Sequence, residues 1–181
     1  MNTGKLIVAT PSVIGDFNFH RSVVLLTNYK TSGSVGFILN KKLDYTLDEV
    51  MDGIYDKFPL YFGGPVEQDN LFYIHTLGDK ISNSVRISKT LYWNGDFKSV
   101  NNLLKKGELN QENIRFFLGY SGWTEGQLEE EIKLKSWEPF EIKSVLELIK
   151  MPTKDMWREC MEALGGEYLL WSNTPDNPNY N

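Results

Sequence analysis

Cysteine and histidine are scarce in this sequence: its 181 residues include one cysteine, Cys160, and two histidines, His20 and His75. A single cysteine excludes an internal disulfide, and so few thiols and imidazoles leave no zinc-ligand spacing. We therefore expect no metal site and a reducing compartment. Cys160 shares a helical stripe of apolar residues with Met156 and Leu164, which predicts a buried, unreactive thiol.

Long apolar runs are also missing. No run approaches the length of a membrane span, and residues 1–15 lack the charged-then-apolar pattern of a signal peptide. The cytoplasm follows by elimination, and no membrane partner is expected.

Positive charge is in deficit, with a formal net charge of −5 and a pI of about 5.1. Because nucleic acid is bound by basic surfaces, direct nucleic-acid binding is not expected. Residues 1–42 are an exception, since they hold five cations against Asp16 alone, a local balance of +4. That excess indicates either a basic patch or a solvated face.

Strands dominate the predicted secondary structure. Apolar, β-branched or alternating segments predict them at 5–9, 22–27, 35–40, 60–62, 71–75 and 85–88. The second and third should form a hairpin, and the fourth and fifth should be antiparallel neighbours. Strands that follow one another directly favour the α+β class with mainly antiparallel pairing, with room for one parallel pair across the helices.

About four helices are predicted, at 47–55, 97–106, after Thr124 and from Pro152 to Leu164. The first follows a capping box of Thr46 and Glu49, and Asp96 caps the second. Residues 140–149 fit a strand or a helix equally. We predict one compact α+β domain over 1–171, built as a single unit or as two lobes, and an Asn- and Pro-rich tail over 172–181.

Residues 116–137, FFLGYSGWTEGQLEEEIKLKSW, are the most strongly specified stretch. An apolar strand leads into a predicted glycine-rich turn, GYSG, and then a helix. Thr124 and Gln127 have the spacing of a capping box, in which the Thr oxygen accepts a helix-start N–H and the Gln side chain reaches back to the cap.

Short motifs along almost the whole chain resemble those of one known family. They are GKLIVATP (4–11), FHRSV (19–23), GFILN (36–40), GGPV (63–66), IH (74–75), LGYSGW (118–123), GQLE (126–129) with Glu131, and Trp157 with LG (164–165). Each motif alone is weakly specific. In this order and spacing they resemble the YqgE/AlgH family of small bacterial cytosolic proteins.

The resemblance implies a compact α+β fold of bifurcated, coiled β-sheets with helices packed around them. No enzymatic activity and no general cofactor is established for the family that the chain resembles. Some members are described as transcriptional regulators, but no recognisable DNA-binding helix pair comes with the family pattern.

Polar residues gather near predicted strand and helix ends, where binding groups on a rigid scaffold usually lie. The candidate binding residues are Asn40, His75, Tyr120 and Gln127, with Trp123 as a wall and Glu131 as a rim carboxylate. The hypothesis is that they converge on one pocket. The alternative is that these side chains only satisfy buried backbone groups.

No catalytic set is evident. Ser121 lies between glycines, but GYSGW does not match the G-x-S-x-G nucleophile turn. We therefore expect a non-enzymatic regulatory or interaction protein that acts through a protein partner or a small ligand and affects transcription indirectly. Two alternatives stay open: a cryptic hydrolase using His75 with Ser121 or Glu131, and a nucleotide- or anion-binding protein using its glycine-rich turns.

Overall fold

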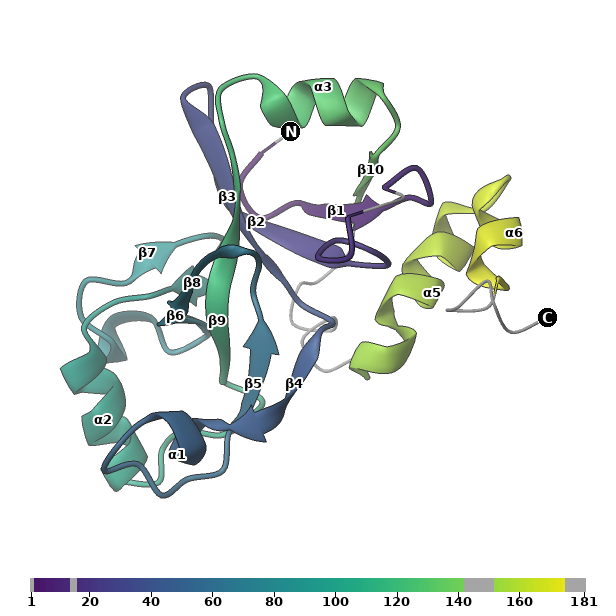
Figure 1. Cartoon of the computed structure of the whole chain (residues 1–181). Helices are drawn as coiled ribbons and strands as arrows, with labels where there is room; N and C mark the ends of the chain where they lie inside the picture. The colour runs from purple at the N-terminus through teal and green to yellow at the C-terminus, as the bar shows by residue number, and fades with distance from the viewer. Residues whose placement is uncertain (1, 14–15, 142–151, 175–181) are drawn as a thin grey trace.

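One branched sheet runs through the molecule, with helices over its faces and at its ends (Figure 1). The structure, a computed structural model, describes residues 2–13, 16–141 and 152–174. In that part of the chain the sheet has ten strands, mostly antiparallel, and five α-helices pack around it. The predicted α+β class with bifurcated, mainly antiparallel sheets is confirmed. The ambiguous segment at 142–149 lies outside the described residues.

The elements follow one another in an irregular order. The strands are β1 (Leu6–Ala9), β2 (Val23–Lys30), β3 (Gly33–Ile38), β4 (Lys42–Thr46), β5 (Pro59–Phe62), β6 (Val66–His75), β7 (Val85–Arg86), β8 (Tyr92–Trp93), β9 (Ile114–Trp123) and β10 (Trp137–Phe140). The helices are α1 (Leu47–Val50), α2 (Phe97–Lys105), α3 (Gln127–Lys133), α5 (Thr153–Leu164) and α6 (Tyr168–Ser172). Sequence patterns did not predict β4, β8, β10 or α6.

The branch lies on β9, the strand common to both arms of the sheet. One edge of β9 pairs with β6, while the other pairs first with β5, in parallel, and then with β3. β3 continues through β2 and β1 to β10. The predicted parallel pair is therefore β5 with β9. The predicted β5–β6 pair is wrong, because β9 lies between them, and the predicted turn at 119–122 is wrong, because β9 continues to Trp123.

Glycine permits two backbones to touch at the branch. A Cβ on Gly63 would lie 2.1 Å from the carbonyl oxygen of Gly119, and one on Gly64 would lie 2.3 Å from the carbonyl carbon of Tyr120. No other residue fits such contacts. The carbonyl of Gly63 also accepts the backbone N–H of Ile38 at 3.0 Å, so both branches of the sheet are bonded at this point.

Three apolar clusters fill the space between sheet and helices. Trp157, Cys160 and Met161 of α5 pack on one arm of the sheet, and α2 covers the other arm with Val100 and its neighbours. A third cluster lies under α3. Each fully buried large aliphatic or aromatic side chain contributes about 1.5–3 kcal/mol, so α2 and α5 are held mainly by their apolar faces.

The helix predictions hold where a cap and a complete apolar stripe coincide. Asp96 accepts the N–H of Lys98 at 3.0 Å and begins α2 as expected. The predicted helix at 47–55 is a single turn, because the backbone is already extended at Met51. Val50, expected in its buried stripe, is exposed.

α3 starts later than its predicted cap. Gly126, with φ of 73°, is the residue before the helix, so Thr124 is not the N-cap. Half of the predicted box exists: the Gln127 side chain accepts the Thr124 N–H at 3.0 Å. The Thr124 hydroxyl contacts the same Gln127 oxygen at 3.1 Å instead of a helix N–H.

Gly63→Ala is predicted to destabilise the protein by about 3 kcal/mol or more, because the added methyl meets rigid backbone. Gly107→Ala is the matched control: Gly107 has φ of 66° with nothing within 4 Å of the added Cβ. It should cost only about 1–2 kcal/mol, for the left-handed conformation. Denaturant unfolding measures both, and equal losses would remove the close approach as a constraint.

Cys160 is predicted to react slowly in the native protein. Its side chain is 2% exposed, and burial raises its pKa from 9.0 to about 12. That rise lowers the thiolate fraction at neutral pH about a thousandfold. A thiol reagent should label the denatured chain quickly and the native chain far more slowly, whereas comparable rates would contradict the burial.

Candidate functional site

Three of the six sequence-predicted residues meet at one carboxylate. One oxygen of Glu131 accepts the indole N–H groups of Trp123 at 2.9 Å and Trp137 at 2.8 Å. Its other oxygen accepts the Gln127 amide at 2.9 Å. These residues line a cavity of about 250 Å³ beside Phe19. Because three donors already occupy the carboxylate, its evident task is to hold α3 against β9 and β10.

His75 lies in the interior. It is 1% exposed and stacks on Tyr92, with ring centroids 5.7 Å apart. Its Nδ1 accepts the Leu77 N–H at 3.3 Å, which places the proton on Nε2, 3.1 Å from the carbonyl oxygen of Asn94 and 3.0 Å from the Ser84 hydroxyl. Burial lowers the His75 pKa, and the Asn94 hydrogen bond opposes that shift less strongly.

Tyr120 and Asn40 lie neither at the Glu131 carboxylate nor beside His75. Tyr120 packs edge-on against Phe72 and lines an open groove of about 420 Å³ with Trp123 and the β2–β3 hairpin. Asn40 accepts the Val23 N–H at 2.9 Å and donates to the Arg21 carbonyl at 2.8 Å. The structure brings Trp123, Gln127 and Glu131 together and places Tyr120 beside Trp123 in a second groove, while Asn40 and His75 have other surroundings. The binding role of these residues stays a prediction.

The hydrolase hypothesis required His75 next to Ser121 or Glu131. The Ser121 hydroxyl is buried and donates to the Gly63 carbonyl at 3.0 Å. His75 instead contacts Ser84, and Glu131 binds two indoles. These three side chains therefore do not form a catalytic triad.

A larger cavity, of about 670 Å³, is lined by residues of α5, the end of α6, the loop before β2 and the segment after β3. Its lining includes His20, Arg21, Asn40, Lys41, Lys154, Asp155 and Arg158. In the described part of the chain, four cationic side chains and one carboxylate therefore line the cavity of a protein whose net charge is −5. Charge of this sign makes the cavity a candidate anion site.

Arg21 is held in the cavity by its backbone and its side chain. Its φ of 50° is left-handed, and Asn40 fixes its carbonyl. The guanidinium carbon lies 4.8 Å from the ring centroid of Trp157, and the Nη2 group donates to the Thr174 carbonyl at 2.6 Å. Trp157 is in turn fixed by donating to the Ala9 carbonyl at 2.7 Å. The charge is therefore positioned before any ligand arrives.

Lys41 is positioned in the same way. Its ammonium donates to the carbonyls of Phe17 at 2.9 Å and Asn18 at 2.7 Å. Desolvation lowers its pKa, while the charge of Asp16 acts in the opposite direction. Carbonyl partners orient the ammonium without neutralising it.

The outer cations come from α5. Lys154 and Arg158 are exposed, and Arg158 lies 3.3 Å from Asp155 and 3.8 Å from Glu162. Lys154 has no ion-pair partner within residues 2–13, 16–141 and 152–174 that the structure covers. These flexible side chains can adapt to a ligand, whereas Arg21 and Lys41 are fixed.

Sequence reasoning missed this cavity because no motif spans it. Its residues come from three regions of the chain, at 20–21, 40–41 and 153–174, and the last region lies more than a hundred positions after the other two. Two signals pointed toward it: the positive excess of residues 1–42, which contributes Arg21 and Lys41, and the choice of Asn40 as a candidate residue. Neither signal indicated α5.

No helix in the described residues combines the length and apolar character that a bilayer span requires. Nor, in the same part of the chain, are three His, Cys, Asp or Glu side chains grouped so that they could hold a metal ion.

The branched sheet and the helices packed on it define a small α+β protein that carries a cationic surface cavity. The chain belongs to the AlgH-like family, whose model matches residues 6–169. It is 41% identical to a UPF0301 protein of Bacteroides thetaiotaomicron, over 98% of this chain and 90% of the relative. It is 40% identical to one of Cytophaga hutchinsonii, over the full length of both.

Solved structures share the fold. The solution structure of the AlgH protein from Pseudomonas aeruginosa matches with a TM-score of 0.75 and 24% identity, over 96% of this chain and 94% of that one. The crystal structure of protein DIP2367 from Corynebacterium diphtheriae matches with a TM-score of 0.73 and 21% identity, over 96% and 93%. The expected resemblance to the YqgE/AlgH family is confirmed.

The burial of His75 predicts a pH-dependent stability. Its folded-state pKa lies below its unfolded value of about 6.5, so the unfolded chain binds the proton more readily. Stability should be complete above about pH 6.5 and decrease below it, by at most about 1.4 kcal/mol per pH unit. A proton on Nδ1 would also remove the acceptor of the Leu77 N–H hydrogen bond and place two N–H groups against each other.

Unfolding free energies between pH 5.5 and 7.5 test this, in a window above most carboxylate titrations. The chain has only one other histidine, the exposed His20. His20→Asn should retain the decrease toward low pH, and His75→Gln should lose it while lowering stability at pH 7.5. An unchanged slope in His75→Gln would assign the effect to other groups.

Proposed function

We propose that this protein is a non-enzymatic binding protein whose cavity between α5 and the loop after β1 takes a small anionic ligand. Binding would serve a regulatory or interaction role in the cytoplasm. The observation that carries the proposal is the set of four cations, Arg21, Lys41, Lys154 and Arg158, around one cavity of an acidic protein.

A small ligand suits this site better than nucleic acid does. The cavity volume of about 670 Å³ falls within the ordinary range for small-molecule pockets, roughly 300–1,000 Å³. Nucleic acid is bound by extended basic surfaces, which an acidic chain with one local basic cavity does not favour. Any effect on transcription would then be indirect, through a protein partner that responds to the ligand-bound form.

The test is thermal unfolding and calorimetry of the purified protein with small anions, cations and neutral metabolites. A ligand that binds only the native state stabilises it, by about 2.7 kcal/mol at a hundred times its Kd. We expect stabilisation by anions only, and a decrease in affinity of about tenfold or more in Lys154→Gln/Arg158→Gln. Both side chains are exposed, so this variant should fold.

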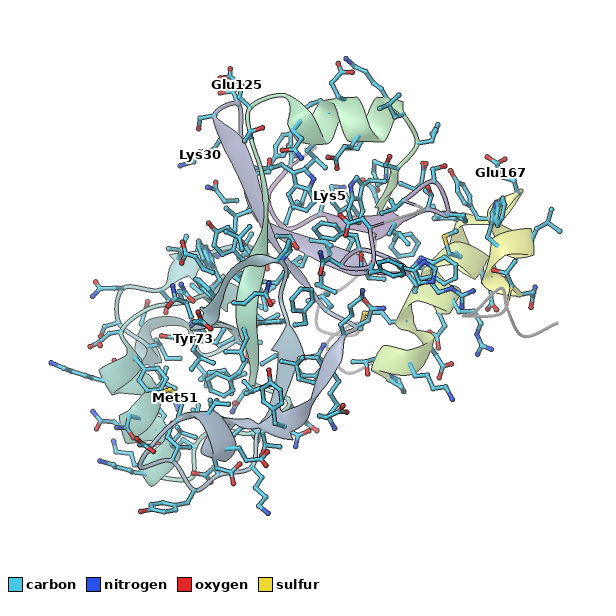
Figure 2. All side chains as sticks on the ribbon, in the orientation of Figure 1. Lys5, Lys30, Met51, Tyr73, Glu125 and Glu167 are labelled. Carbon is cyan, nitrogen blue, oxygen red and sulfur yellow. The ribbon has the colours of Figure 1, made fainter. Side chains whose placement is uncertain are left out.

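The matched control is Lys30→Gln, which also removes an exposed positive charge. Figure 2 shows Lys30 with Glu125 at the tip of the β2–β3 hairpin, away from α5 and α6. It should bind like the unaltered protein. Equal losses in Lys30→Gln and in a single Lys154→Gln variant would indicate a general charge effect, and the proposal would fail if no anion stabilised the protein.

A further inference from the structure

We infer that the ligand of this cavity carries a phosphate group, as a phosphate monoester or a diphosphate. The inference rests on the proposed function, because it names the chemical class of the anion. Three properties of the cavity lead to it: its net charge, the directions from which its donors come, and the start of α5.

The charge of the cavity matches a multiply charged group. Within the described residues that line the cavity, Arg21, Lys41, Lys154 and Arg158 meet one carboxylate, Asp155, which lies 3.3 Å from Arg158. Just outside the lining, Glu162 lies 3.8 Å from Arg158, and the charge of Asp16 acts on Lys41. A phosphate monoester carries a charge of about −1.5 to −2 at pH 7 on one group, whereas a carboxylate carries about −1. A phosphate therefore offsets more of this charge in the same space.

The donors also approach from different elements. Arg21 comes from the loop before β2, Lys41 from the segment after β3, and Lys154 with Arg158 from α5. A tetrahedral phosphate offers three terminal oxygens in three directions, while the two oxygens of a carboxylate lie in one plane. Convergence from several sides favours the tetrahedral group.

The start of α5 adds to these cations. The first three residues of this 12-residue helix, 153–155, line the cavity. The N–H of Asp155 in this first turn donates to the Pro152 carbonyl at 3.2 Å. The positive end of the helix dipole adds to the attraction that the four charged side chains exert on a phosphate.

The experiment compares ligands of equal total charge. Calorimetric titrations with glycerol 3-phosphate and with succinate, each carrying about two negative charges at neutral pH, are run at matched ionic strength, followed by pyrophosphate. We expect glycerol 3-phosphate and pyrophosphate to bind at least tenfold more tightly than succinate. Lys154→Gln/Arg158→Gln should lower both phosphate affinities at least tenfold, and Lys30→Gln should leave them unchanged.

The outcomes separate this inference from the proposed function. Succinate binding as tightly as glycerol 3-phosphate, and weakened by Lys154→Gln/Arg158→Gln, would overturn the phosphate assignment and leave an anion site. Binding of none of the anions would overturn both.

A vesicle measurement identifies the source of the phosphate. Vesicles containing phosphatidic acid present a phosphate monoester on a lipid, and phosphatidylcholine vesicles are the control. Binding of phosphatidic acid vesicles alone, lost in Lys154→Gln/Arg158→Gln, would support the phosphate assignment and place the group on a lipid. Binding of both vesicle types alike would count against recognition of phosphate.

Discussion

The structure depends on one close approach of two backbones, where Gly63 and Gly64 cross β9 at Gly119 and Tyr120. Any side chain on Gly63 would overlap the carbonyl of Gly119. At this crossing the edge of β9 changes partner from β5 to β3, and the Gly63 carbonyl is bonded to Ile38 and to Ser121. The branch of the sheet therefore exists because glycine occupies the place where the two arms separate.

The branch creates separate faces, each covered by its own helix. α2 closes the arm that carries β6, α3 covers one face of the other arm, and α5 covers the opposite face. Glu131 joins α3 to β9 and β10 through two indoles, and Trp157 joins α5 to β1 through the Ala9 carbonyl. These hydrogen bonds hold α3 and α5 in fixed positions on the sheet. The cavities beside these two helices are therefore lined by residues whose positions are fixed.

The basic cavity results from this arrangement together with an unequal distribution of charge. A chain of net charge −5 places four of its 19 lysines and arginines around one hollow. Arg21 and Lys41 are fixed there by carbonyl partners, while Lys154 and Arg158 extend from α5 into solvent. A preformed inner surface with an adaptable rim lowers the entropy cost of binding, because half of the charges are already ordered.

The sequence by itself determined what depends on local order: the strand patterns, the cap of α2 at Asp96, the apolar stripe of α5, and the motifs at 4–11, 36–40 and 118–123 that indicated the family. These are properties of neighbours along the chain, and the hydrophobic period and turn chemistry express them directly. Only the tertiary structure decided that Gly119 lies inside a strand and that His75 is enclosed by Ser84 and Asn94. It also brought Arg21 beside α5, because contacts between residues far apart in the chain arise when the branched sheet closes, and no local pattern encodes which distant charges then become neighbours.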